Sequence, residues 1–171
     1  MQPKKIGFTI GKFAPLHKGH QFLIETGLKE MDEFITIIYE TNKIETPLEQ
    51  RAKWIQTLYP QSKVILAHNP PNQYGLDQES VAIQMEYLTK IINQYPVTHF
   101  YSSEPYGEKV AQYLNIVDRR VDNQRTKYPI SATNIRKEIE QNRTYLSDIV
   151  YKDLKNSYQF KLGEHSKKNE K

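Results

Sequence analysis

Two imidazoles stand three residues apart near the start of the chain, in the segment Gly11–His20 (GKFAPLHKGH). If a helix begins at about His17, then His17 and His20 share one face of its first turn. Free backbone N–H groups and the positive end of the helix dipole make such a turn an anion site, where imidazoles would donate hydrogen bonds to phosphate oxygens. Gly19 has no side chain to block an approaching ligand. The segment matches neither a dinucleotide-binding GxGxxG fingerprint nor a P-loop.

The spacing of the histidines does not by itself choose between a phosphate site and a plain pair of surface side chains. A zinc site is disfavoured, because the chain has no Cys and no third ligand is evident beside the pair.

A second segment, Pro129–Arg136 (PISATNIR), opens a helical pattern expected over about 134–140. Ser131 or Thr133 can cap that helix, which is a sufficient structural reason for one hydroxyl. Arg136 in its first turn would oppose the helix dipole, a placement that makes sense where dipole and guanidinium both face an anion. The alternative is a solvated Arg136 that pairs with Glu140 four residues on.

Together the two segments are similar to the paired motifs GxFxPxHxGH and ISxTxIR of the HIGH-type nucleotidyltransferase superfamily. Ser102–Gly107 (SSEPYG) and Val121–Arg125 (VDNQR) extend the resemblance to the NadR-like nicotinamide mononucleotide (NMN) adenylyltransferases, over about residues 5–140. Many NadR proteins also carry a ribosylnicotinamide kinase domain, and some a DNA-binding one. This sequence has no P-loop, so the resemblance leads us to expect adenylyl transfer alone.

The resemblance implies that ATP and NMN react to give NAD and pyrophosphate, with Mg²⁺ bridging the phosphates. His17 and His20 would contact the triphosphate near the α-phosphate, and Arg136 would hold the departing pyrophosphate; these three are the expected catalytic residues. Lys12 would add a cation, although its side chain could equally reach into solvent, and Phe13 could equally be a packing residue. The residues expected to bind ATP are Gly11, Lys12, Phe13, Gly19, Ser131, Thr133, Ser103 and Gly107.

The acceptor end of the site is less defined by the sequence. The nicotinamide ring is expected near the carboxyl end of the second strand and the helix after it, so Asn42, Arg51 and Trp54 are the candidates. Trp54 could stack on the pyridinium ring, but a core position is the alternative. Ser102–Gly107 is a candidate ribose and adenine loop, or an ordinary link between a strand and a helix.

Alternating strand and helix patterns must position these residues. Apolar or β-branched runs predict strands at 6–10, 34–39, 64–67, 98–101 and 115–118. Helices are expected from about residue 17, after a capping box at 46–49, and near 81–92, 108–114, 134–140 and 144–155. This order predicts a doubly wound, Rossmann-like parallel five-stranded sheet with helices on both faces and a helical C-terminal segment. Ligands in such folds bind beyond the carboxyl ends of the strands.

Composition restricts the classes of function. The 171 residues suit one nucleotidyltransferase domain over 1–160, followed by a polar, disordered tail over 161–171. The formal charge is +4, and the four Lys and two Glu of that tail supply +2 of it, so basicity gives little support for nucleic-acid binding. No apolar run is long enough for a membrane helix, and the absence of Cys excludes disulfide scaffolds and thiol nucleophiles. We expect a cytoplasmic enzyme with ATP and NMN as its partners, and a homo-oligomer is compatible with the sequence.

Other functions stay open at this point. A sibling transferase could use nicotinate mononucleotide, phosphopantetheine or choline phosphate as the acceptor. A catalytically silent nucleotide sensor would bind NAD or ATP and would tolerate loss of His17 or Arg136, both of which are present. A fragment of a class I aminoacyl-tRNA synthetase would share the first motif.

Overall fold

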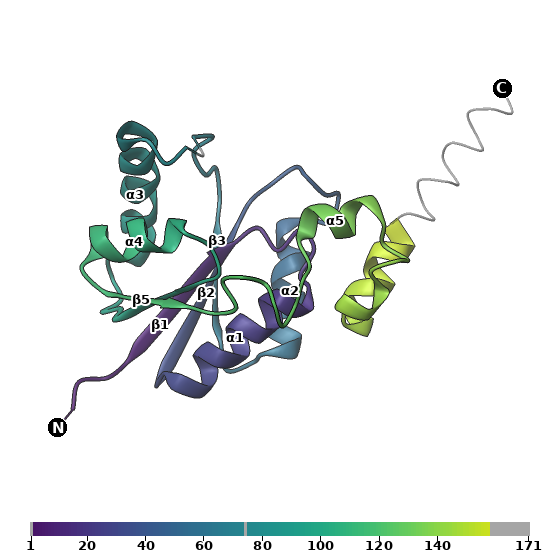
Figure 1. Ribbon diagram of the computed structural model, residues 1–171, viewed down its shortest axis with the longest axis horizontal. Coiled ribbons are helices and arrows are strands. Elements are labelled where there is room, and N and C mark those ends of the chain that lie inside the picture. Colours follow the sequence, from purple (N-terminus) through teal and green to yellow (C-terminus); the bar gives the residue numbers. More distant parts are fainter. Residues whose placement is uncertain (1, 74, 158–171) are drawn as a thin grey trace, which may run out of the picture.

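The apolar runs expected to form strands do so, and they pair in parallel throughout. The computed structural model describes residues 2–73 and 75–157, and over these ranges it contains a five-stranded sheet of order β3-β2-β1-β4-β5 (Figure 1). The predicted doubly wound, Rossmann-like sheet is confirmed, whereas the predicted tail at 161–171 lies outside the described residues. The strands are β1 (Ile6–Gly11), β2 (Glu33–Tyr39), β3 (Lys63–Ala67), β4 (His99–Ser102) and β5 (Val117–Arg120).

Helices bury both faces of this sheet. In β2, Phe34 and Ile38 face one core cluster while Ile35 and Ile37 face the other, as a strand covered on both sides requires. The first cluster lies under α1 and α2, and the second lies under α3 and α4. The helices are α1 (Lys18–Glu30), α2 (Leu48–Leu58), α3 (Gln78–Ile92), α4 (Tyr106–Leu114) and α5 (Ala132–Lys137).

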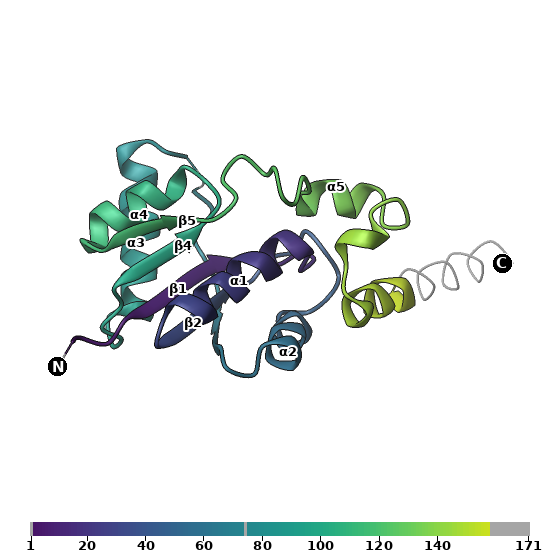
Figure 2. The ribbon, with the colours of Figure 1, turned by 60° about the horizontal axis from the view of Figure 1, so that its bottom comes forward.

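The C-terminal segment is helical, as expected, but is divided differently. The pattern at 134–140 ends early, at Lys137, and a 3₁₀ turn, η1 (Arg143–Tyr145), precedes helical residues 148–157. These elements lie beyond the end of the sheet opposite the N-terminus (Figure 2). None of the helices in the described part of the chain is long and apolar enough to cross a membrane.

Two predicted boundaries are wrong for local reasons. β5 begins at Val117 rather than at 115, because Asn115 adopts the left-handed conformation (φ 54°) that ends α4. The capping box at 46–49 does not form, because α2 begins at Leu48 and its N-cap residue is therefore Pro47, not Thr46. Proline has no side-chain acceptor for the N–H groups of the first turn. Thr46 is buried instead, and its carbonyl accepts a hydrogen bond from Arg51.

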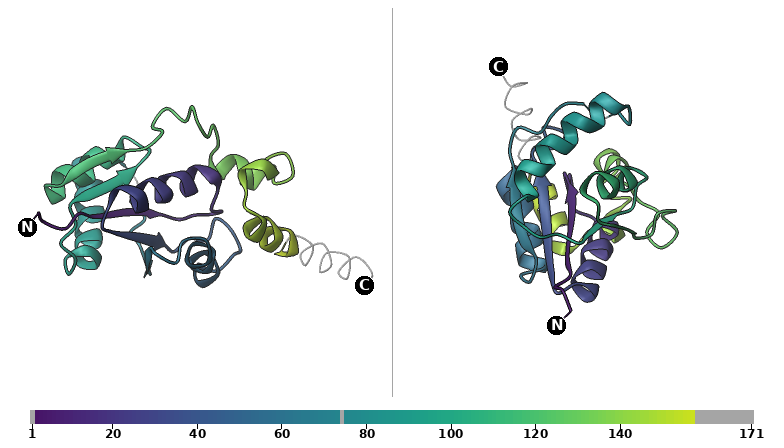
Figure 3. Two further views of the ribbon diagram at one scale, coloured as in Figure 1. Left: turned by 90° about the horizontal axis from the view of Figure 1, so that it is seen from below. Right: turned by 90° about the vertical axis from the view of Figure 1, so that its left-hand side faces the viewer.

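The connections diverge at the centre of the sheet. β1 leads into α1 on one face and neighbouring β4 leads into α4 on the other, which makes the carboxyl ends of these strands a topological switch point. The segment 121–131 then runs from β5 past the N-terminal half of α1 to reach α5 (Figure 3). Tyr128 and Lys127 of that segment both pack on the ring of Phe22. The starts of α1 and α5 are thereby brought to the same edge of the sheet.

Candidate active site

A cavity of about 450 Å³ lies at the switch point, beyond the carboxyl ends of β1 and β4. We call it the central cavity. Its walls come from the loop after β1, the start of α1, the loop after β4 and the segment between β5 and α5. The sequence-predicted residues that line it are Gly11, Lys12, Phe13, His17, Gly19, His20, Ser103, Ser131, Thr133 and Arg136.

His17 and His20 cap α1 reciprocally. Nδ1 of His17 accepts hydrogen bonds from the backbone N–H groups of Gly19 (3.1 Å) and His20 (3.4 Å), and Nδ1 of His20 accepts one from the N–H of His17 (3.2 Å). The two rings stack with centroids 3.7 Å apart. Because each Nδ1 is an acceptor, a neutral ring carries its proton on Nε2. Each imidazole therefore keeps an Nε2–H donor for another group.

Burial sets the protonation state of this pair. It lowers the pKa of His17 to about 4, and the positive charge of Arg125 acts in the same direction. Burial also lowers the pKa of His20 well below its usual range, with help from the charges of His17 and Arg125. Both imidazoles are thus neutral hydrogen-bond donors at pH 7.

This burial predicts an acid-dependent loss of stability. The unfolded chain protonates His17 at about pH 6.5 and the folded chain only near pH 4, so the unfolded state binds more protons between these values. The free energy of unfolding should fall as the pH drops through that window, by about 3 kcal/mol from His17. Urea titrations at pH 7.5, 5.5 and 4.5 on the wild type and on His17→Asn measure it. Parallel pH curves for the two proteins would contradict the assignment.

Gly19 leaves room for the imidazole ring of His17. A Cβ at this position would lie 2.9 Å from Cε1 and 3.0 Å from Nδ1 of His17, so the missing side chain makes room for the capping ring. Gly19 also lines the central cavity, so the expectation that it leaves room for a ligand stays a prediction. Phe13 has a left-handed backbone (φ 47°), and its buried ring packs edge-on against His20. Its side chain is therefore a packing group, whereas its backbone shapes the loop.

Arg136 reaches across the cavity to the loop after β1. Its Nη1 donates to the carbonyl of Ala14 at 2.7 Å, and its Nη2 to Oγ1 of Thr133 at 3.3 Å. Ser131 caps α5, since its Oγ accepts a hydrogen bond from the N–H of Asn134. The start of α5 and the loop that leads to His17 are thus joined directly.

Two expectations about Arg136 are wrong. Because α5 is six residues long, Arg136 lies in its last turn, where the helix dipole favours a cation. The helix dipole therefore gives no argument for an anion bound beside Arg136. Arg136 nevertheless lines the same cavity as His17 and His20. Nor does Arg136 pair with Glu140, whose carboxylate instead accepts from Tyr151 and pairs with Lys155.

The structure gives Arg51 and Trp54 structural positions. Trp54 is fully buried and donates its indole N–H to Asp153 at 2.7 Å, so no face of the ring is open for stacking on a ligand. Arg51 is 1% exposed and donates to the carbonyls of Thr46, Tyr39 and Lys12. Both predictions of contact with nicotinamide are wrong because α2 turns this face into the core. Arg51 instead fastens the loop after β1 to the end of β2.

Asn42 and Gly107 also lie away from the central cavity. Asn42 lines a separate hollow of about 350 Å³ behind Arg136. Gly107 packs α4 against β4, since a Cβ there would come within 2.3 Å of Oγ of Ser102. Gly107 therefore supports the loop after β4 and does not line the cavity.

Sequence reasoning missed a further cavity, of about 640 Å³, beside the first. We call it the side cavity. Its walls are largely apolar or aromatic and include Tyr39, Tyr106, Pro70, Pro71 and Leu76. The Pro-rich segment 67–78 was identified only as a loop, and its prolines were the available signal. These walls are formed by stretches of chain that lie far apart in the sequence, from the end of β1 to the segment after β5, and no local motif indicates such a combination.

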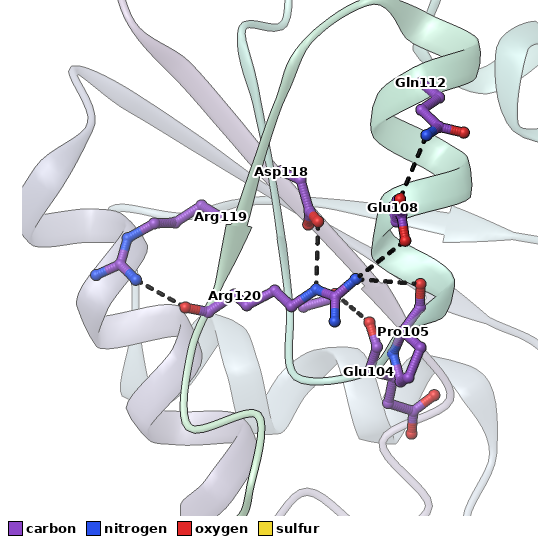
Figure 4. Close-up of polar contacts among 8 residues, drawn as sticks. Glu104, Pro105, Glu108, Gln112, Asp118, Arg119 and Arg120 are labelled. Carbon is purple, nitrogen blue, oxygen red and sulfur yellow. Dashed lines mark hydrogen bonds and ion pairs between the residues drawn. The ribbon is translucent and has the colours of Figure 1, made fainter.

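An ion-pair network holds the loop after β4 in place. Arg120 pairs with Asp118 (3.2 Å) and Glu108 (3.8 Å) and donates to the carbonyl of Pro105 (3.4 Å), as Figure 4 shows. The loop that carries Ser103 is thus tied to β5. Asp122 fixes the next segment, because its carboxylate accepts the backbone N–H groups of residues 126, 127 and 128.

A parallel sheet of this order with a cavity at its switch point is an arrangement typical of nucleotide-binding α/β domains. The chain belongs to the cytidylyltransferase-like family, whose sequence profile matches residues 8–138.

Two curated relatives are similar to the chain. They are the trifunctional NAD biosynthesis/regulator proteins NadR of Escherichia coli and Salmonella typhimurium, each 28% identical over 153 and 151 residues respectively. The matches cover 79% and 78% of this chain but only 37% and 36% of the relatives. The chain thus spans little more than a third of their length.

Solved structures share the fold. A NadR protein in complex with NAD and AMP-PNP superposes with a TM-score of 0.62 at 22% identity, covering 86% of this chain and 46% of that one. A second structure is a bifunctional NMN adenylyltransferase/ADP ribose pyrophosphatase from Francisella tularensis, complexed with AMP and a Mn ion. It superposes with a TM-score of 0.60 at 19% identity, covering 97% of this chain and 56% of that one.

Proposed function

We propose that this chain transfers the adenylyl group of ATP to NMN, giving NAD and pyrophosphate. The observation that carries the proposal is the convergence of His17, His20 and Arg136 on one cavity at the switch point. Similarity to NadR proteins, which are named for NAD biosynthesis, supports the choice of acceptor. So does the complex of a NadR fold relative with NAD and AMP-PNP.

The chemistry needs donors and positioning rather than a protein nucleophile. An ionised phosphate oxygen of the acceptor attacks the α-phosphorus, and a new O–P bond forms as the bond to the bridging oxygen breaks. Pyrophosphate leaves with that electron pair. Nε2–H groups of His17 and His20 donate to the charge that develops around the α-phosphate, while Arg136 and Thr133 hold the leaving phosphates. Aligning two bound reactants can account for about 7–11 kcal/mol of barrier reduction.

The remaining predicted ATP contacts fit the same arrangement. Ser131 directs the start of α5, and the backbone at Gly11 and Phe13 borders the phosphates beside Lys12. Ser103 lines the central cavity from the loop after β4, where its hydroxyl is a further candidate contact for ATP.

Magnesium fits as part of the substrate, Mg·ATP. Asp122 already accepts three backbone N–H groups, and Glu104 pairs with Arg125. Within the described ranges no group of three His, Asp or Glu is placed to hold a metal ion. Phosphate oxygens and water would therefore supply most ligands of Mg²⁺, an ion that usually keeps several waters.

The side cavity is the acceptor site in this proposal. Tyr39 and Tyr106 offer flat apolar surfaces for a pyridinium ring, in place of the buried Trp54. This choice replaces Asn42, Arg51 and Trp54 as the acceptor-binding set.

Purified protein incubated with Mg·ATP and single acceptors tests the function. NMN should release pyrophosphate and yield a product with the mass of NAD. Nicotinate mononucleotide and phosphopantetheine serve as competing acceptors. Turnover of one of these without turnover of NMN would contradict the specific proposal, and nucleotide binding without any turnover would favour a sensor.

A further inference from the structure

The central cavity and the side cavity share a wall. Residues that line both come from the end of β1, the loop after β4 and the segment after β5. In the proposed function the central cavity holds the triphosphate and the side cavity the acceptor, so the two reacting phosphates must meet at this wall. The residues that line both cavities are Ile10, Gly11, Lys12, Ser103, Glu104, Tyr106 and Arg125.

Arg125 is the guanidinium on that wall. Its Nη1 donates to the carbonyl of Ile130 at 3.1 Å, and its Nη2 pairs with the carboxylate of Glu104 at 3.4 Å. The Glu104 side chain is 65% exposed, so this second contact is a weak, solvent-screened ion pair. A dianionic phosphate can displace such a carboxylate, because a guanidinium fork binds phosphate oxygens strongly.

The backbone conformation that places the Arg125 side chain on this wall is an unfavourable one. Arg125 adopts a left-handed conformation (φ 51°), which is unfavourable for a residue with a Cβ. The Asp122 carboxylate stabilises the turn by accepting the N–H groups of residues 126–128. The turn thus keeps one side chain directed at the wall between the cavities, close enough for its charge to act on both histidines.

We propose that Arg125 binds the phosphate of the acceptor mononucleotide at this wall, and that Glu104 competes with that phosphate for the guanidinium. The inference rests on the proposed function. It assigns Arg125 to the acceptor, whereas Arg136 serves the triphosphate. It also gives Glu104 an inhibitory effect on acceptor binding, which a structural ion pair would not have.

Steady-state kinetics on Arg125→Ala and Glu104→Gln test the proposal. Arg125→Ala should raise KM for NMN at least about 20-fold and change KM for Mg·ATP less than about 3-fold. Glu104→Gln should lower KM for NMN about 2- to 5-fold, because it removes the competing charge. Arg120→Ala is the matched control, since Arg120 also fastens the loop after β4 but lines neither cavity. It should leave the ratio of the two KM values unchanged.

Several results would overturn the inference. Equal increases in both KM values for Arg125→Ala would indicate a loosened loop, and a rise confined to Mg·ATP would assign Arg125 to the triphosphate. A higher KM for NMN in Glu104→Gln would exclude competition. If the wild type uses another phosphate acceptor, the proposed function fails and the same comparison is made with that acceptor. If it turns over none, calorimetric Kd values for NMN replace KM.

Discussion

Replacing His17 by asparagine is expected to lower kcat at least 100-fold while the fold stays intact. Asparagine is a good helix cap, so its side-chain oxygen can still accept the N–H groups of Gly19 and His20. What is lost is the Nε2–H donor that, in the proposed mechanism, stabilises the charge developing around the α-phosphate. Alanine would remove the cap and the donor together, so asparagine separates the two roles of His17.

The measurement is pyrophosphate release at saturating Mg·ATP and NMN, with circular dichroism and urea unfolding as checks on the fold. Asp77→Asn is the matched control, because Asp77 caps α3 through Ser80 and lines neither cavity. That variant should keep kcat within about 2-fold of the wild type. A His17→Asn enzyme with near-normal turnover would remove His17 from the proposed mechanism.

Arg136→Ala is expected to lower kcat/KM for Mg·ATP at least 100-fold, through both a slower step and weaker binding. The variant loses the guanidinium that we propose holds the leaving phosphates, and charge-assisted contacts with phosphate are among the strongest in proteins. Arg136→Lys should recover only part of the loss, since a lysine supplies charge without the planar fork.

The control for this prediction is Arg143→Ala. Arg143 also bonds a carbonyl, that of Leu146, and pairs with a carboxylate, that of Asp148, yet it lies outside the central cavity. Initial rates over a range of Mg·ATP concentrations separate the two variants. Equal kinetics for both would show that Arg136 acts only as a tie to the carbonyl of Ala14.

Much of the fold follows from local pattern. Strands such as FITIIY at 34–39 are recognisable in the sequence, because a strand that is buried on both faces is apolar along nearly its whole length. The two motifs also fix their local structure, since His17 and His20 cap the helix that they begin and Ser131 caps α5. For that reason the residues of the two motifs that line the central cavity, where we propose that the triphosphate binds, could be predicted.

The acceptor half depends on non-local contacts. In the sequence Arg51 has the character of a solvent-exposed cation. In the structure it is buried and donates hydrogen bonds to carbonyls up to 39 residues away in the chain. Trp54 is closed off by Asp153, 99 residues later. The side cavity joins Tyr39, the loop near Pro70, Tyr106 and Arg125, which meet only after the sheet has formed. Helical periodicity shows that a face is apolar but not what covers it.

Segment 121–131, fixed by Asp122, places Arg125 on the wall shared by the two cavities and ends at Ser131, which lines the central cavity. In the proposed function a change in this segment would affect the triphosphate and the acceptor together, so a redesign for an unnatural acceptor should leave it unchanged. The stretch around Pro70 and Leu76 borders the side cavity alone. In the proposed function it is therefore the segment where the range of acceptors can be changed without altering the ATP site.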